Sequence, residues 1–174
     1  MIEGEVSGYK LSYKNLRKSH IRELYYFELY LGDRFVGWCN YFTGRGEYVP
    51  WIEIDYDPWP REEGTEVELF KFFYNLLPPM GRLFVTYEKD KETEEMIFKG
   101  YHAMDTPLGF SMLRAGFTWF KVWYYPEGGN EGAPKLQGNR PLNEEVARRE
   151  LEEALEEVKR EEVRRWILEH VKGK

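Results

Sequence analysis

The sequence predicts an α/β (α+β) protein in which helices flank a mixed sheet and a long C-terminal helix follows it. Three observations carry this prediction. Two aromatic and β-branched runs, 24–31 and 34–42, flank Gly32-Asp33, a pair that a two-residue hairpin turn prefers. A strand, a helix and a second strand follow the hairpin. Residues 143–171 then have the composition of one charged helix.

The strand–helix–strand segment sets the predicted topology. Residues 48–57 alternate apolar and polar side chains, as a half-buried strand does. Apolar residues at helical spacing follow over 65–77, and 82–87 is a compact apolar run typical of a buried strand. Because the helix returns the chain to the same side of the sheet, we expect the two strands to be parallel and to separate at their C-terminal ends.

The second half of the domain continues this pattern. We expect helical segments over 92–104 and 106–115, with Gly116 ending the second one. A strand is predicted over 117–125, and a short edge strand near 135–137.

The C-terminal helix is predicted to form an extension, 139–174, of a domain that spans 1–138. Asn143 can cap the helix and acidic residues occupy its first turn. Its apolar residues fall on two offset stripes, so we expect a bend near Arg160 or a change of partner there. One hypothesis is a homodimer in which a second subunit covers one stripe, and the alternative is that both stripes pack on the same chain. The stripes consist of Leu151, Leu155 and Val158, and of Val163, Trp166, Ile167 and Val171.

Composition narrows the class of protein. The formal charge is −6 and no basic patch is evident, which disfavours nucleic acid as a partner. No signal peptide and no membrane-spanning run of apolar residues occurs, and Cys39 is the single cysteine, so we expect a cytoplasmic protein without disulfides. Cys39 is interpreted as a small buried hydrophobic residue. With 32% charged residues and a single Gln, the composition is typical of a thermophile.

A glycine-containing segment between the predicted strand and helix is the candidate cofactor site. The backbone N–H groups at a helix N-terminus bind phosphate oxygens, and glycine lets a ligand approach the backbone. The alternative interpretation is an ordinary helix start. The segment is Arg61, Glu62, Glu63, Gly64, Thr65 and Glu66.

This segment resembles the pyrophosphate loop of the GNAT superfamily of acyl-CoA-dependent N-acyltransferases, Arg/Gln-x-x-Gly-x-Gly/Ala. Arg61 and Gly64 match, whereas Glu66 replaces the final small residue. The run 113–117 (LRAGF) is similar to the helix end and Gly-Phe that precede a late strand in the superfamily. The resemblance covers about Tyr9 to Tyr125 and implies acetyl-CoA or another acyl-CoA as cofactor.

Two positions depart from the superfamily. Met112 stands where a Tyr commonly acts as general acid, and Asp105 where an Asn is often found. The stretch 101–120 also resembles an uncharacterised archaeal family associated with this superfamily, a kinship that implies no substrate.

Glu53 and Asp55 are the candidate catalytic bases. They share one face of the predicted strand with Trp51, and a carboxylate with a raised pKa could take the proton of an attacking amine. The alternative is that both are solvated residues of a half-exposed strand. Three hydroxyl groups could replace the missing Tyr as acid: those of Tyr87, Tyr101 and Ser111.

The histidines, His20, His102 and His170, are too scattered to predict a metal site. The sequence therefore predicts an N-acyltransferase that transfers an acyl group from acyl-CoA to an unknown amine. The alternative is a catalytically inactive protein of the same fold that binds CoA or a protein partner.

Overall fold

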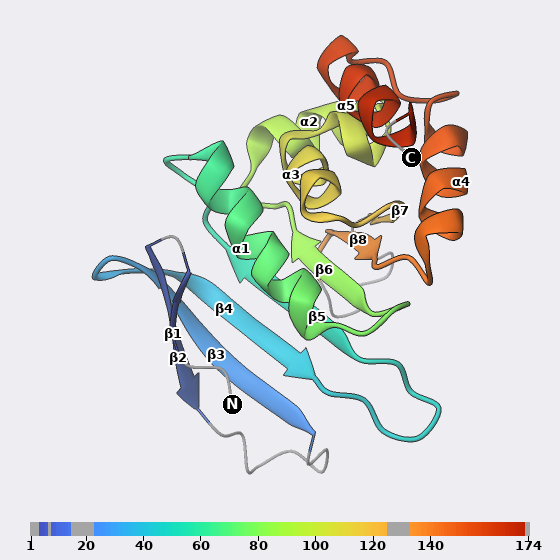
Figure 1. Ribbon diagram of the computed structural model, residues 1–174. Helices are drawn as coiled ribbons and strands as arrows, with labels where there is room; N and C mark the ends of the chain where they lie inside the picture. The colour runs from blue at the N-terminus through green and yellow to red at the C-terminus, as the bar shows by residue number, and fades with distance from the viewer. Residues whose placement is uncertain (1–3, 7, 15–22, 125–132, 173–174) are drawn as a thin grey trace.

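The computed structural model describes residues 4–6, 8–14, 23–124 and 133–172 of the chain (Figure 1). In these ranges the strands are β1 (Gly4–Val6), β2 (Tyr9–Lys14), β3 (Leu24–Leu31), β4 (Arg34–Phe42), β5 (Trp51–Tyr56), β6 (Arg82–Thr86), β7 (Trp119–Trp123) and β8 (Lys135–Asn139). The helices are α1 (Glu63–Leu76), α2 (Lys91–Phe98), α3 (Pro107–Ala115), α4 (Glu144–Ala154) and α5 (Glu161–Lys172), with a 3₁₀ turn, η1, at Ala103–Asp105.

The described strands form one mixed sheet in the order β1-β2-β3-β4-β5-β6-β8-β7. The predicted hairpin is β3–β4, closed by Gly32 at φ 63°. The predicted crossover is β5–α1–β6, and β5 and β6 are parallel, whereas the other neighbouring strands are antiparallel. The α+β class predicted from the sequence is confirmed.

The parallel pair ends before its strands do. The ladder runs from Trp51↔Arg82 to Ile54↔Val85, and β5 then continues to Tyr56 without a ladder partner on β6. The separation of the two strands at their C-terminal ends stays a prediction. β5 leads into the loop before α1, and β6 leads toward Asp90, which binds Arg61 of that loop.

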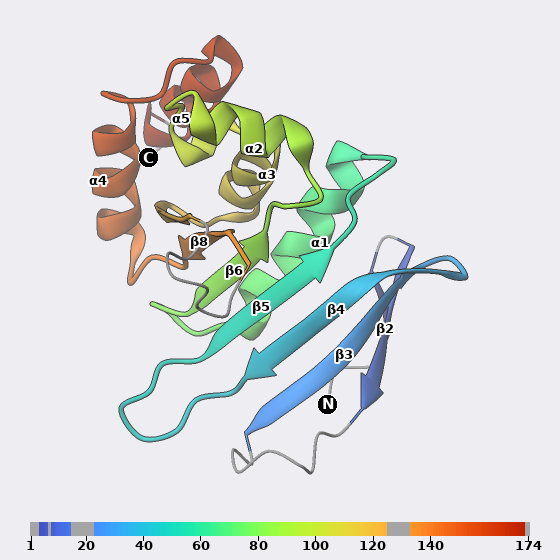
Figure 2. The same cartoon turned by 180° about the vertical axis from the view of Figure 1, so that it is seen from behind.

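In the described part of the chain, α1 and α3 lie over one face of the sheet, and the other face of β3, β4 and β5 has no helix over it. Figure 1 shows α1 and α3 in front of the strands, and Figure 2 shows β3, β4 and β5 from behind with no helix across them. Because side chains alternate along a strand, Ile52, Ile54 and Tyr56 point into the helix-covered core while Glu53 and Asp55 face the other side. Cys39 is buried in this core, as predicted.

The edge strand expected near 135–137 is instead an interior strand. β8 pairs with both β6 and β7, and Leu136 and Gln137 are buried. Gly138 permits this position, because a Cβ there would lie 2.8 Å from Met112 Cε and 3.1 Å from Phe117 Cβ. The prediction failed because Lys135–Asn139 has no apolar alternation, so its place in the sheet is set by distant packing.

The single long C-terminal helix is also corrected, because α4 and α5 are two helices separated by residues 155–160. The buried Asp105 carboxylate accepts the backbone N–H groups of Lys159 (3.0 Å) and Arg160 (2.9 Å) and so organises the turn. The bend predicted near Arg160 is confirmed. Residues of both stripes pack in a second core cluster with η1 and α3, formed by Met104, Phe110, Leu113, Leu151, Ala154, Val158, Val163 and Ile167.

Candidate functional site

The N-terminus of α1 is open toward solvent. Glu62 occupies the N-cap position, but its side chain makes no capping hydrogen bond to the helix. A Cβ built on Gly64 would meet no heavy atom within 4 Å. The first turn therefore has no side-chain cap and has open space beside Gly64, and uncapped N–H groups at a helix start can bind an anion.

Arg61 lies directly before this helix and is mostly buried, with 8% of its side chain exposed. Its Nη2 donates to Asp90 Oδ2 at 2.5 Å, and its Nε lies 3.4 Å from Glu66 Oε2. The indole of Trp59 packs 5.5 Å from the guanidinium. Among the described residues, Nε and Nη1 of Arg61 have no hydrogen-bond partner. A buried guanidinium nitrogen without a hydrogen bond is costly unless water or a ligand accepts one from it, and this applies most to Nη1, since Nε still contacts Glu66.

Glu66, the departure from the resembled motif, points into the core. It accepts hydrogen bonds from the hydroxyl groups of Tyr56 and Ser111, the latter at 2.6 Å. Burial raises the pKa of Glu66, while Arg61 and these hydroxyl groups oppose the rise. The carboxylate is thus turned away from the open helix end and links β5, α1 and α3.

Asp90 is the residue of this network that sequence reasoning missed. It is buried, caps α2, and accepts from Thr93 Oγ1 at 2.7 Å as well as from Arg61. The capping pattern of Asp90 with Thr93 was readable from the sequence, but its pairing with a residue 29 positions earlier was not.

The two predicted bases lie on the uncovered face of the sheet, and each is paired with a lysine. Glu53 Oε2 accepts from Lys135 Nζ at 2.7 Å, and Asp55 Oδ1 lies 3.2 Å from Lys89 Nζ. Their side chains are 26% and 20% exposed. The structure therefore brings Glu53 and Asp55 together, and separates them by the sheet from the Glu66 network.

The candidate acids are placed differently from one another. Tyr87 is buried and donates to the carbonyl of Trp123, and Ser111 is occupied by Glu66. Tyr101 lies half-buried under Lys159, with its ring 5.4 Å from the ammonium. Met112 is fully buried against Gly138.

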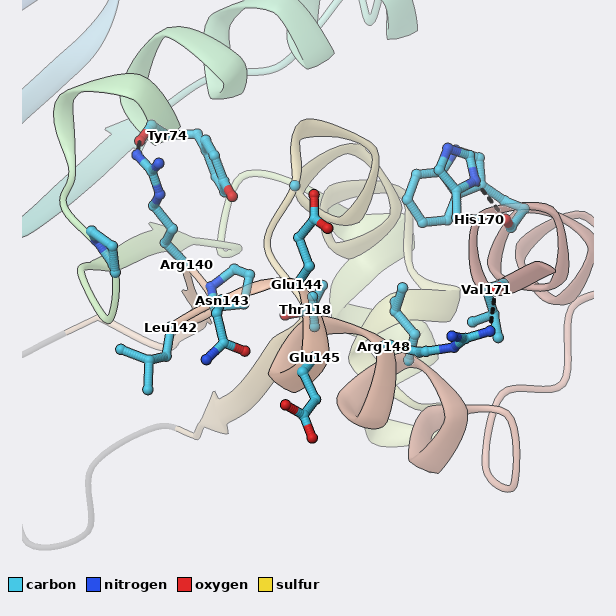
Figure 3. A pocket seen from close by; sticks show the side chains of 16 residues that line it. Tyr74, Thr118, Arg140, Leu142, Asn143, Glu144, Glu145, Arg148, His170 and Val171 are labelled. Carbon is cyan, nitrogen blue, oxygen red and sulfur yellow. Dashed lines mark hydrogen bonds between the residues drawn. The ribbon is translucent and has the colours of Figure 1, made fainter. Parts of the chain in front are cut away.

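A cleft of about 710 Å³ lies between the sheet domain and the C-terminal helices, away from the start of α1 (Figure 3). Its cations are used within the chain: Arg140 donates to the carbonyls of Tyr74 and Leu77, and Arg148 to that of Val171. His170 stacks on Trp166. Nothing in the sequence pointed to this cleft, because its walls come from segments that are distant along the chain.

Two further properties concern the described residues alone. They contain no group of three or more His, Cys, Asp or Glu side chains placed to hold a metal ion. Within the same ranges, every helix is too short or too polar to cross a bilayer.

Comparison with known proteins identifies relatives without a known activity. A solved structure of a protein of unknown function from Aquifex aeolicus VF5 is similar, with 28% sequence identity and a TM-score of 0.74. The match covers 99% of this chain and 95% of that one. A comparison with curated proteins gives no match. A family model described as "Protein of unknown function (DUF1122)" matches residues 7–165, and the chain therefore belongs to that family.

Proposed function

We propose that the chain binds an acyl-CoA and transfers its acyl group to an amine. One observation carries the proposal. At the carboxyl ends of the parallel strands β5 and β6, the uncapped start of α1 lies beside Arg61, whose buried Nη1 has no hydrogen-bond partner among the described residues and whose Nε has only the Glu66 carboxylate at 3.4 Å. A diphosphate offers the acceptor oxygens that such donors lack.

The residues present fit the phosphate end of that ligand. Gly64 leaves space beside the helix N-terminus, and Asp90 and Glu66 hold the Arg61 guanidinium in place and neutralise its charge, so Arg61 contributes hydrogen-bond donors and no net charge. Glu66, the residue least compatible with a phosphate, is held in the core by Tyr56 and Ser111. Its carboxylate therefore does not occupy the approach to Gly64.

The end of the β5–β6 ladder supports a place for the reacting part of the ligand. Beyond Ile54↔Val85 the two strands are not paired, so Asp55 and Tyr56 follow the end of the ladder. An acyl-CoA, when bound, supplies the activated acyl group. Glu53 or Asp55 would take the proton from the amine nitrogen as that nitrogen bonds to the acyl carbon and the carbon–sulfur bond breaks. The thiolate that leaves would receive a proton from solvent, because Met112 cannot donate one.

A second candidate function is ligand binding without catalysis. Met112 replaces the expected acid and is fully buried, and both candidate bases are already paired with Lys89 and Lys135. An amine would have to displace these ammonium groups to reach the carboxylate oxygens that they contact. These observations favour a non-catalytic member of the same fold.

Calorimetry with acetyl-CoA tests binding. Gly64→Leu adds a bulky side chain at a position where a Cβ meets no heavy atom within 4 Å, so we expect acetyl-CoA affinity to fall at least ~10-fold while the melting temperature changes little. Glu68→Leu, an exposed position on the same helix, is the matched control. No heat from the native protein, or equal affinities in both variants, would overturn the site.

Release of free thiol from acetyl-CoA then separates the two functions. Amine-dependent thiol release that disappears in Glu53→Gln or Asp55→Asn supports transfer. Binding without release across primary amines of different length supports the non-catalytic function.

The oligomeric state and location are separate proposals. The sequence suggested a homodimer formed through the C-terminal helix, but α4 and α5 bury residues of both apolar stripes within their own chain. This packing supports the monomeric alternative. Light scattering at high protein concentration decides, since a monomer mass rejects the dimer. A cytoplasmic location is proposed from the single, buried Cys39.

A further inference from the structure

Four of the six tryptophans of the chain lie on the face of the sheet opposite α1 and α3, which we call the tryptophan face. Trp38 of β4 and Trp51 of β5 are half-buried, and Trp119 and Trp123 of β7 are 40% and 43% exposed. Figure 2 shows β4 and β5 from this side. A sheet face that meets only water carries mostly polar side chains, so this concentration of indoles indicates a contact surface. Their neighbours along the strands pack in or against the core on the other side: Cys39, Ile52, Phe120 and Val122.

The strand pairing places polar side chains between two of these indoles. Trp38 lies opposite Asp55 on the neighbouring strand, and Asn40 lies opposite Glu53. Trp51 comes four residues before Asp55 on β5, about 13 Å along the strand at a rise of about 3.3 Å per residue. Trp38 and Trp51 therefore flank a polar stretch that is longer than one six-membered ring.

The charges at the centre of the tryptophan face are paired with one another. Lys135 contacts Glu53 at 2.7 Å, and Lys89 contacts Asp55 at 3.2 Å. A charged ligand would have to break one of these pairs, so the face favours a ligand without net charge. Each pair still presents carboxylate oxygens that accept hydrogen bonds and an ammonium group that donates them.

A hydroxyl group on the same face has no hydrogen-bond partner among the described residues. Leu83 and Val85 are in the core, so Thr86 of the same strand alternates to the tryptophan face. Thr86 is 4% exposed, and its Oγ1 is buried without a hydrogen bond. Its cross-strand neighbour is Lys135, the partner of Glu53. A buried hydroxyl of this kind is costly unless water or a ligand pairs with it.

Three other kinds of occupant fit the tryptophan face less well. A nucleic acid needs an excess of cations, whereas the charges here are paired and the whole chain carries −6. A second copy of the chain would bury Glu53 and Asp55 at the centre of an interface, where charged residues are normally depleted. A wholly apolar ligand would take water from the Asn40 amide without replacing its hydrogen bonds.

We propose that the tryptophan face binds a neutral oligosaccharide between Trp38 and Trp51. A sugar ring presents C–H groups on its faces, which an indole can cover, and hydroxyl groups around its rim. Because hydroxyl groups both donate and accept, they can pair with Asn40, Glu53 and Lys135 without breaking the ion pair. The distance between the two indoles calls for more than one sugar ring. This binding site goes beyond the proposed function and does not depend on it, since it requires no acyl-CoA.

Calorimetry with maltohexaose, cellohexaose and chitohexaose, which are neutral oligosaccharides, tests the proposal on the full chain. We expect at least one of them to bind ~10-fold or more tightly than its monosaccharide, because only the longer ligand reaches both indoles. Trp38→Leu and Trp51→Leu should each weaken that ligand ~10-fold or more. Trp166→Leu, the same change on α5 outside the tryptophan face, should leave the affinity within ~2-fold.

Fluorine NMR of the native chain labelled with fluorotryptophan gives a second measurement, which serves if a leucine variant melts early. Conservative Trp→Phe variants, which keep an aromatic ring, assign the signals. We expect the bound oligosaccharide to shift the signals of Trp38 and Trp51 and to leave that of Trp166 in place.

The outcomes separate the competing occupants from one another and from acyl transfer. If none of the three oligosaccharides binds the native chain at millimolar concentration, or if only the Trp166 signal shifts, the carbohydrate site is wrong. A dimer in light scattering that Trp38→Leu dissociates would assign the face to a second copy and overturn the proposal. Binding that the Trp38 and Trp51 variants weaken supports the site whether or not acetyl-CoA releases thiol, so acyl transfer can fail separately.

Discussion

Two corners of the molecule each pair an arginine with a buried aspartate, but only one of them is complete. At the α4–α5 turn, Asp105 binds two main-chain N–H groups, and Arg160 returns a hydrogen bond to the Asp105 carbonyl. At the β5–α1 corner, Arg61 is paired with Asp90, yet its Nε and Nη1 make no hydrogen bond to a described residue. In the first corner, the turn at residues 155–160 with Asp105, the carboxylate has hydrogen-bond partners; we call this corner the α4–α5 joint. In the second corner, donors of Arg61 make no hydrogen bond. A buried charge whose donors make no hydrogen bond lowers the stability of the fold. Proteins tolerate such a cost at sites that bind a ligand.

The largest expected effect comes from breaking the β5–α1 corner. Glu66→Ala removes the carboxylate that receives Tyr56 and Ser111 and that lies beside Arg61. We expect the free energy of unfolding to fall by about 3–5 kcal/mol, because a buried charge and two hydroxyl groups lose their partner. Urea denaturation measures the change, with the exposed Glu68→Ala as control. Equal losses in the two variants would show that the network contributes no stability.

The next largest loss of stability is expected from removing apolar packing at the α4–α5 joint. Ile167 is fully buried in the cluster that attaches α5 to α3, while the adjacent Leu168 is 38% exposed. Ile167→Ala should cost about 2–5 kcal/mol, and Leu168→Ala less than about 1 kcal/mol. Thermal melting of both variants checks the difference. A small effect at Ile167 would mean that α5 packs loosely on the domain.

A smaller loss of stability is expected when the Asp105 carboxylate at the α4–α5 joint is changed. Asp105→Asn keeps one acceptor oxygen but replaces the other with an amide that cannot accept a hydrogen bond. Either the N–H of Lys159 or that of Arg160 is left unpaired, so we expect a loss of about 1–3 kcal/mol. Limited proteolysis between α4 and α5 should speed up in parallel. An unchanged cleavage rate would contradict the view that Asp105 organises this turn.

The two corners also mark what sequence can predict. The structure contains the hairpin, the β5–α1–β6 crossover and the bend near Arg160, and each follows from patterns of neighbouring residues along the chain. The interior place of β8 depends on Gly138 packing against Met112, which no local pattern reveals.

The candidate site divides in the same way. Arg61 and Gly64 could be found as a motif before a helix. The inward turn of Glu66 could not, because its partner Ser111 lies 45 positions away. The same holds for the Arg61–Asp90 pair, and for Lys135 on Glu53 at a separation of 82 positions. Burial and pairing of charges are properties of the folded chain, so the sequence identifies such residues but not their partners.

The smallest expected effect is a pH dependence of stability caused by His102, which lies close to the α4–α5 joint. The ring Nδ1 of His102 accepts the N–H of Met104 at 3.0 Å, and Nε2 lies 3.7 Å from Glu157. Burial lowers the pKa of His102, although Glu157 and Asp105 oppose this. A lowered pKa in the folded state means that the stabilisation is present above about pH 6.5, the ordinary value for histidine, and is lost as the pH falls through the folded pKa. Each pH unit by which the pKa is lowered corresponds to about 1.4 kcal/mol.

His102→Asn keeps a side-chain acceptor for the same N–H but does not titrate in this range. We therefore expect the free energy of unfolding of the native chain to fall relative to that of His102→Asn between about pH 7 and 5, as measured by urea denaturation. Curves that stay parallel across this range would show that His102 does not couple the joint to pH.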